Sequence, residues 1–205
     1  MDIAAQTVRR HLEASRDAMV AAMADQDLTA AIVSIASRME QCLRAGGKIL
    51  LAGNGGSAAD AQHIAGELLS RLNFDRNPLP GIALTADTSV LTAIGNDYGY
   101  DDVFARQVRG LGRAGDVFVG ISTSGRSPNI LKALAVAKEC GLCAVGFTGR
   151  NNAPLGGLCD IVLRAPSTAT PLIQQIHITA AHAICELVEN AMFGDRRAAR
   201  TPEAG

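Results

Sequence analysis

Five short apolar segments alternate with longer segments of helical length along this chain. The apolar segments occupy residues 48–52, 81–85, 116–121, 142–147 and 160–164. The helical segments occupy about 57–72, 88–95, 101–111, 127–140 and 171–192. Such alternation is typical of βαβ units, in which parallel strands form one sheet with helices on both faces. We therefore expect an α/β fold built on a five-stranded parallel sheet.

Two more helices are expected before the first strand, over residues 3–45. Apolar residues recur there at helical spacing, including Val8, Leu12, Met19 and Met23. Asp27 is a candidate cap for the second of these helices. The apolar faces are long for helices that cover only their own sheet. Packing between subunits and docking within one chain therefore stay open as alternatives.

Length and charge narrow the class of protein. The 205 residues suit one domain, expected over 1–192, with N-terminal helices at 3–45 and an α/β core at 46–192. Residues 193–205 are small and polar and are expected to form a flexible tail. A net charge of −1 gives no electrostatic reason to expect nucleic acid or an anionic membrane as a partner. No apolar run reaches the roughly 18 residues of a membrane span.

The cysteines indicate the compartment. Five are scattered along the chain, and the N-terminus lacks the pattern of a secretory signal, so we expect free thiols in a reducing cytoplasm. Cys140 and Cys143 have the spacing of a redox motif. The simpler interpretation is a helix that ends at Cys140, a cap at Gly141 and a strand that starts at Leu142.

Two serine-bearing loops each follow an apolar strand and open a helix. The first serine loop is residues 53–57 (Gly-Asn-Gly-Gly-Ser), and the second serine loop is residues 122–127 (Ser-Thr-Ser-Gly-Arg-Ser). Small residues let the backbone approach a ligand closely, and a helix N-terminus offers unpaired N–H groups to an anion. Neither loop contains a lysine, as expected for a phosphorylated sugar more than for a nucleoside triphosphate. Both loops lie at the carboxyl ends of strands, where open parallel sheets bind ligands.

Two other interpretations of these loops remain. Gly53, Gly55 and Ala58 match the G-x-G-x-x-G/A pattern of dinucleotide-binding proteins. The acidic residue that should follow is Asp87, which comes over 30 residues after Gly55 instead of the usual 20 or so. Plain tight turns are the second alternative.

The helix after the first serine loop carries three groups with acid–base chemistry. Asp60, His63 and Glu67 are spaced by three and four residues, which places them on one helix face. That face begins at the loop, so it is expected to line the same crevice. The alternative is a solvated i,i+4 pair on the surface.

The last helix carries polar groups in an apolar sequence, where they are costly unless paired. Gln174 and His182 are eight residues apart and project roughly 80° apart, so they can flank one site. His177 points elsewhere and is expected to have a structural role or to face a neighbouring subunit. Together His63, Glu67, Gln174 and His182 could bind a divalent metal ion. The same groups could equally serve as acid, base and orienting groups.

Five motifs stand in order along the chain. They occupy residues 53–57, 60–63, 95–97, 122–125 and 173–177. Together they resemble the motifs of the sugar isomerase (SIS) domain family, and more narrowly those of the phosphoheptose isomerases, which act on sedoheptulose 7-phosphate. The resemblance extends from the N-terminal helices to about residue 192. It implies a flavodoxin-like parallel sheet flanked by helices, with the N-terminal helices used in a homotetramer.

The resemblance also implies an activity. The family converts D-sedoheptulose 7-phosphate to D-glycero-D-manno-heptose 7-phosphate, the first step towards nucleotide-activated heptose. By motif match, His63, Glu67, Gln174 and His182 fall on the zinc-ligand positions, with one Zn²⁺ per subunit. Glu67 and His182 also fall on the acid–base pair, and we take Glu67 as the base and His182 as the acid. The implied substrate-binding residues are Asn54, Gly55, Gly56, Ser57, Glu67, Asn96, Asp97, Ser122, Thr123, Ser124, Ser127 and Gln174.

Two departures and two alternatives accompany this resemblance. Gln175 stands where many relatives carry Glu, and Pro171 precedes the Gln174 motif as in only some relatives. One alternative is a non-catalytic SIS protein that binds a replication initiator or a sugar-phosphate ligand. Such a relative lacks Glu and His at the positions of Glu67 and His182, and both are present here. The other alternative is an isomerase for a pentose or hexose phosphate, because one carbon more or less changes few contacts.

Overall fold

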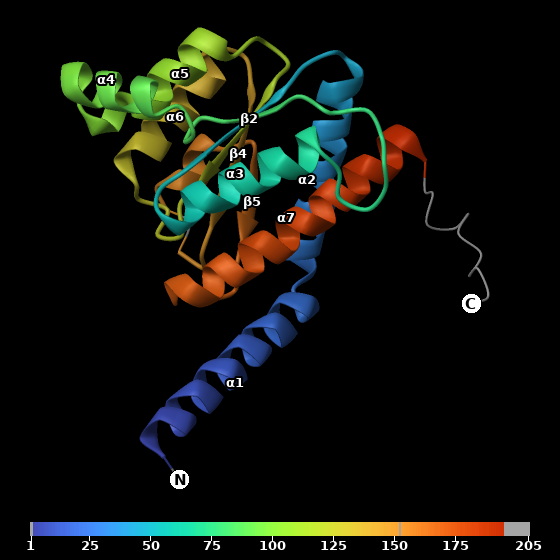
Figure 1. Ribbon diagram of the computed structural model, residues 1–205, viewed down its shortest axis with the longest axis vertical. Coiled ribbons are helices and arrows are strands. Elements are labelled where there is room, and N and C mark those ends of the chain that lie inside the picture. The colour runs from blue at the N-terminus through green and yellow to red at the C-terminus, as the bar shows by residue number, and fades with distance from the viewer. Residues whose placement is uncertain (1, 152, 195–205) are drawn as a thin grey trace.

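The computed structural model contains one sheet of five parallel strands in the order β2-β1-β3-β4-β5 (Figure 1). It describes residues 2–151 and 153–194, so most of the expected tail at 193–205 lies outside the described residues. The strands are β1 (Ile49–Gly53), β2 (Gly81–Ala83), β3 (Val117–Ile121), β4 (Cys143–Thr148) and β5 (Ile161–Arg164). Neighbouring strands are parallel throughout. This strand order is that of flavodoxin-like sheets, so the expected fold class is confirmed.

Helices cover both faces of the sheet and make three layers. The helices are α1 (Ile3–Ala24), α2 (Gln26–Arg44), α3 (Gly56–Leu69), α4 (Thr88–Tyr98), α5 (Val103–Leu111), α6 (Pro128–Glu139) and α7 (Thr170–Phe193). Helices α2, α3 and α7 pack on one face, and α5 and α6 pack on the other (Figure 1). The short 3-10 helices η1 (Tyr100–Asp102) and η2 (Leu155–Leu158) contact α6, in the same helical layer as α5.

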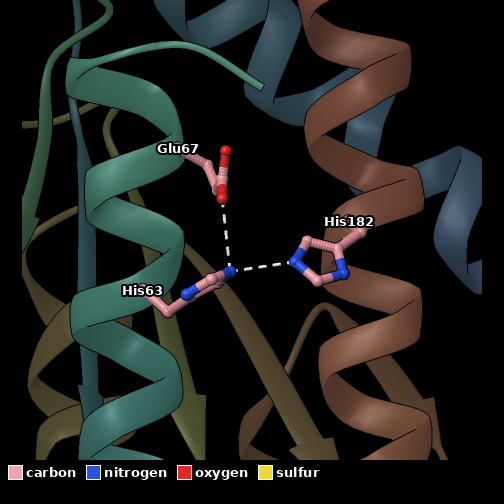
Figure 2. Close-up of side chains that lie close together, drawn as sticks. All are labelled: His63, Glu67 and His182. Atoms are coloured by element: carbon pink, nitrogen blue, oxygen red, sulfur yellow. Dashed lines mark hydrogen bonds and ion pairs between the residues drawn. The ribbon is translucent and has the colours of Figure 1, made fainter. Parts of the chain in front are cut away.

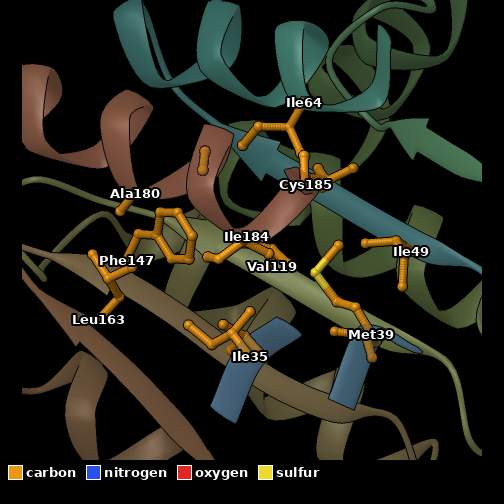
Figure 3. Close-up of a cluster of buried hydrophobic side chains, with 14 of the residues drawn as sticks. Ile35, Met39, Ile49, Ile64, Val119, Phe147, Leu163, Ala180, Ile184 and Cys185 are labelled. Carbon is orange, nitrogen blue, oxygen red and sulfur yellow. The ribbon is translucent and has the colours of Figure 1, made fainter. Parts of the chain in front are cut away.

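Both faces of the central strands are buried, which explains why their sequences are continuously apolar and not alternating. Ile49 and Leu51 of β1 join the core under α2, α3 and α7, whereas Leu50 faces α5 and α6. Figure 3 shows the first of these cores, where Ile35 of α2 and Ile184 of α7 gather with Val119 and Phe147 of the sheet. Aliphatic residues supply most of the two cores, with Phe104, Phe118 and Phe147 buried among them, because the chain has only five phenylalanines and no tryptophan.

The junction of the first two helices differs from the expected one. Asp25, not Asp27, caps α2, since its carboxylate accepts the amide hydrogen of Leu28 at 3.0 Å. A cap residue takes a non-helical backbone conformation, and Asp25 does so at the same point where α1 ends. Asp27 instead lies within the first turn of α2.

Helix α1 does not bury its apolar face within this chain. It contains no buried residue, and its N-terminal half extends away from the body of the molecule (Figure 1). Ile3, Val8 and Leu12 are exposed, and only Ala18, Met19 and Ala22 pack against the core. Of the two N-terminal helices, α2 docks within the chain along its length, whereas α1 does so only through its C-terminal part. Packing between subunits stays a prediction for the exposed part of α1.

The described residues contain no single helix that is long and apolar enough to cross a membrane. The pair α1 and α2 meets such a length and composition test only when joined, and the two helices are bent by 73° at their junction.

The Cys140–Cys143 segment has the structural role given by the simpler interpretation. Helix α6 ends at Glu139 with Cys140 as its cap. Gly141 follows with φ of +77°, a conformation that L side chains rarely adopt, and β4 begins at Cys143.

His177 joins α7 to the end of β4. Its Nε2 lies 3.0 Å from the carbonyl oxygen of Thr148, and the residue is buried. Because a carbonyl only accepts, Nε2 carries the hydrogen, and Nδ1 is buried without a hydrogen-bond partner. Burial lowers the pKa of His177 to about 4, although the bond to Thr148 opposes this shift. The structural role expected for His177 is confirmed.

A neutral buried histidine makes stability depend on pH. The unfolded chain takes up a proton near pH 6.5, whereas the folded chain excludes it until about pH 4, so stability falls as pH falls through this window. We expect the change to be about 2 kcal/mol between pH 6.5 and 5. Urea unfolding at several pH values checks this: His177→Gln should lose this part of the pH dependence, and His11→Gln on exposed α1 should retain it. Equal pH dependence in both variants would contradict the prediction.

Candidate active site

The two serine loops emerge side by side at one edge of the sheet. β1 and β3 are neighbours in register, with Gly53 opposite Ile121, so the loops that follow them start at the same level. The first serine loop leads to α3 on one face, and the second leads to α6 on the other face. This divergence of neighbouring connections creates the crevice at which open α/β sheets bind ligands.

The first serine loop is shaped by its glycines. A Cβ at Gly53 would collide with the carbonyl group of Ser57, so the chain turns back on itself there. Gly55 has φ of +56°, which favours glycine. Helix α3 begins at Gly56 with no side-chain cap. The N–H groups of Ser57 and Ala58 donate back to the carbonyls of Asn54 and Gly55 at 3.0 Å, so an anion at this helix start would meet the N–H groups that precede Ser57.

The side chain of Asn54 is held by the protein. Its amide exchanges two hydrogen bonds of 2.9 Å with the buried amide of Asn129 on α6. The hydroxyl of Tyr100 donates a further bond of 3.2 Å to the Asn54 oxygen. This arrangement ties the first serine loop to the helix that follows the second one.

The second serine loop forms a tight turn in which Ser122 is buried. The hydroxyls of Ser122 and Ser127 lie 2.9 Å apart, and the Ser124 hydroxyl accepts from the backbone N–H of Arg126 at 3.2 Å. Gly125 has φ of +67° and bonds back to the carbonyl of Ser122. The backbone carbonyl of Thr123 accepts a hydrogen bond from the N–H of Gly149, which joins the loop to the end of β4.

Three titratable side chains meet between α3 and α7 (Figure 2). His63 and Glu67 lie one turn apart on α3, with His63 Nε2 3.2 Å from Glu67 Oε1. His182 reaches across from α7, and its Nε2 lies 2.9 Å from the Nε2 of His63. The side chain of Glu67 is mostly buried, with 17% exposed, whereas that of His63 is 48% exposed. We call these three residues the His–Glu–His cluster.

The His–Glu–His cluster has the donor set of a divalent metal site. One ligand atom from each residue lies within 4.8 Å of the other two. Two facing imidazole nitrogens cannot both donate to each other, so at least one presents a lone pair. Two imidazoles and a carboxylate are typical zinc ligands. The residues therefore fit a bound Zn²⁺.

Gln174 lies at the other end of the same helix pair. Its amide packs against Gly56, where a Cβ would collide with its Nε2. Gly56 precedes His63 by seven residues, or roughly 10 Å along α3. The structure thus brings His63, Glu67 and His182 together and places Gln174 on the first serine loop. A role for Gln174 as a fourth ligand stays a prediction.

Asn96 and Asp97 lie in the last turn of α4. Both are exposed, and the amide of Asn96 donates to the carboxylate of Asp97 at 2.8 Å. Gly99 follows with φ of +90° and leads to Tyr100, which contacts Asn54. Tyr100 connects this segment to the first serine loop, but a substrate role for Asn96 and Asp97 stays a prediction.

The structure partly buries Asp60, which was expected on this helix face, and it adds an ion pair that no sequence pattern indicates. Asp60 lies one turn before His63, and one oxygen of its carboxylate is buried without a hydrogen-bond partner. Burial raises the pKa of Asp60, and the nearby His63 partly opposes this. Arg76 and Glu189 form a buried ion pair beside the end of α3. Nothing in the local sequence pattern pairs Arg76 with Glu189, because they are 113 residues apart.

Comparisons with known proteins agree with this architecture. The family model described as "SIS domain" matches residues 11–149. A phosphoheptose isomerase from Bradyrhizobium sp. (strain ORS 278) is 57% identical over 190 residues, which are 93% of this chain and 96% of that protein. A phosphoheptose isomerase from Aneurinibacillus thermoaerophilus is 52% identical over 92% of this chain and 96% of its own length.

A solved structure shows the same likeness in three dimensions. The phosphoheptose isomerase from Neisseria gonorrhoeae superposes with a TM-score of 0.84 at 45% identity, covering 90% of this chain and 98% of that one. Identities of 45% to 57% over at least 90% of this chain indicate a shared family and not only a shared fold. The chain belongs to the SIS domain family and, within it, to the phosphoheptose isomerases, a group of sugar-phosphate isomerase enzymes.

Proposed function

We propose that this enzyme converts D-sedoheptulose 7-phosphate to D-glycero-D-manno-heptose 7-phosphate, the first step towards nucleotide-activated heptose. The observation that carries the proposal is the His–Glu–His cluster, which lies two turns along α3 from the first serine loop. A phosphate held at the loop leaves the carbonyl end of the sugar to reach the cluster. The relatives from Bradyrhizobium and Aneurinibacillus support the heptose substrate by their names.

The serine loops supply the binding half of the site. Hydroxyls and backbone amides at helix N-termini hold a phosphate without a lysine. The residues that we assign to substrate binding are Asn54, Gly55, Gly56, Ser57, Glu67, Asn96, Asp97, Ser122, Thr123, Ser124, Ser127 and Gln174. Asn54 acts there through the loop it fixes, because its side-chain amide is already bonded to Asn129 and Tyr100.

The His–Glu–His cluster supplies the chemical half. A ketose–aldose isomerisation moves a proton between C1 and C2 through an enediol and needs a base beside an acid. We assign Glu67 as the base that takes the proton and His182 as the acid that serves the neighbouring oxygen. Both side chains contact His63, from α3 and α7 respectively, so they face one position between the helices (Figure 2).

Zn²⁺, one per subunit, is the cofactor that we assign to this site. His63, Glu67 and His182 would hold it, with Gln174 as the expected fourth ligand. A bound Zn²⁺ would supply Lewis-acid stabilisation of a developing oxyanion.

An assay with sedoheptulose 7-phosphate tests the proposed function. Purified protein with zinc is expected to yield an aldose 7-phosphate, seen as a new anomeric signal by NMR. Removal of metal by a chelator should lower the rate at least tenfold, and added zinc should restore it. Ribulose 5-phosphate and fructose 6-phosphate serve as control substrates. Faster turnover of either would contradict the heptose assignment, and no turnover of any would favour the binding-protein alternative.

We further propose that the enzyme is a cytoplasmic homotetramer. The exposed apolar residues of α1, including Ile3, Val8, Leu12 and Met23, provide a surface for packing between subunits. The five cysteines are all free, as is usual in a reducing compartment.

A further inference from the structure

The two halves of the acid–base pair lie on different helices. His63 and Glu67 belong to α3, and His182 belongs to α7. Their mutual distances therefore depend on how far one helix can slide or rotate against the other. A displacement of about 1 Å at reacting groups can lower a rate a hundredfold. Any contact that fixes the position of α3 relative to α7 should therefore affect the rate of the reaction.

Arg76 binds the C-terminal end of α3 at Glu67, the residue assigned as the base. Its Nη2 donates to the backbone carbonyl of Glu67 at 2.7 Å, and its Nη1 donates to the carbonyl of Leu68 at 2.8 Å. Carbonyls in the last turn of a helix have no partner within the helix. A cation there is favourable as well, because the C-terminal end of a helix carries partial negative charge.

Glu189 holds Arg76 from α7. Its carboxylate accepts from Arg76 Nε at 3.0 Å and from the backbone N–H groups of Leu72 and Asn73 at 3.0 and 2.9 Å. The side chains of Arg76 and Glu189 are 2% and 1% exposed. Glu189 follows His182 by seven residues, which is two turns along the same side of α7.

A buried ion pair of this kind is a poor way to gain stability alone, since desolvation offsets much of the attraction. Its directional bonds do fix geometry, and they join the backbone of Glu67 to the helix that carries His182. We propose that Arg76 and Glu189 are positioning residues that hold α3 and α7 in register for the acid–base pair. This inference rests on the proposed isomerase function.

A second ion pair, Lys48–Asp116, serves as a control, and it lies at the opposite end of the strands from the site. Asp116 is also buried, and it accepts from Lys48 Nζ at 2.6 Å and from the backbone N–H groups of Lys48 and Arg113, each at 2.9 Å. Lys48 and Asp116 immediately precede β1 and β3, whereas the site lies beyond the carboxyl ends of these strands. Asp116→Asn therefore weakens a similar ion pair without touching the α3–α7 contact.

The experiment compares Glu189→Gln, Arg76→Lys and Asp116→Asn in the full-length, zinc-loaded enzyme at a temperature at which each is folded. We expect Glu189→Gln and Arg76→Lys to lower kcat at least tenfold and zinc affinity about tenfold, a loss of the size seen when groups that orient metal ligands are removed. KM should change less than threefold, because the serine loops lie at the other end of α3. Asp116→Asn should lose stability but retain kcat and zinc affinity.

Three results would overturn the inference. One is a folded Glu189→Gln variant with wild-type kcat and zinc affinity, and another is an equal loss of both in Asp116→Asn. If Glu189→Gln does not fold, Arg76→Lys decides instead, because it keeps a cation for Glu189 but cannot bind two carbonyls as well. An Arg76→Lys variant with wild-type kcat and zinc affinity is the third result. If wild-type protein fails to convert sedoheptulose 7-phosphate, the proposed function fails, and zinc affinity alone then decides the positioning role.

Discussion

Replacing Glu67 with glutamine is expected to lower kcat at least about a thousandfold and leave binding of the sugar phosphate in place. Glutamine keeps the shape of the side chain and its contact with His63, but an amide cannot take a proton from carbon near neutral pH. Under the proposed function the phosphate binds at the serine loops, two turns away along α3, so affinity should change far less than kcat even though Glu67 is itself assigned a substrate contact. Single-turnover rates and calorimetric titration with sedoheptulose 7-phosphate measure the two effects separately.

Besides its substrate contact, Glu67 is assigned as a metal ligand and as the base, and the same variant can distinguish these last two roles. If the loss came only from a missing metal ligand, excess zinc would restore the rate of Glu67→Gln. A base is not replaced in this way, so we expect the variant to stay slow when its zinc content equals that of wild type. Glu139→Gln on the exposed face of α6 controls for removal of one carboxylate. Near-normal turnover by Glu67→Gln would overturn the assignment of the base.

The local parts of this architecture could be predicted from the sequence, because each follows from a short-range pattern. Continuous apolar runs gave the five strands, and glycine with serine gave the two loops at their carboxyl ends. Spacings of three and four placed Asp60, His63 and Glu67 on one face of α3. These features depend on neighbours within a few residues of each other.

Contacts between distant segments could not be predicted in the same way. The Arg76–Glu189 pair and the Asn54–Asn129 amide pair join residues 113 and 75 positions apart. The position of Gln174 against Gly56 likewise depends on how α7 packs along α3. Even the short-range cap of α2 lies two residues before the expected one, since Asp25 and Asp27 are equally good caps by type and only the backbone decides between them.

Replacing Gly53 with alanine is the second change from which we expect a large effect. The new Cβ would lie 2.5 Å from the carbonyl carbon of Ser57 and 2.8 Å from its Cβ. These atoms belong to the first turn of α3, so relief requires a shift of the helix that carries His63 and Glu67. We expect a loss of about 2–3 kcal/mol in unfolding free energy, as for overpacked cores. Displacement of the acid–base pair should also lower kcat at least a hundredfold.

Gly66→Ala is the matched control for this prediction, because it adds the same methyl group to the same helix. A Cβ at Gly66 meets nothing within 4 Å, and the residue lies in the helical interior of α3. Alanine there should raise stability by roughly 0.5–1 kcal/mol, since it restricts the unfolded chain and favours the helix. Urea unfolding and steady-state kinetics of the two variants then separate the clash from the added methyl. If Gly53→Ala folds with wild-type kcat, the close return of the chain at the first serine loop is not what aligns α3 with the site.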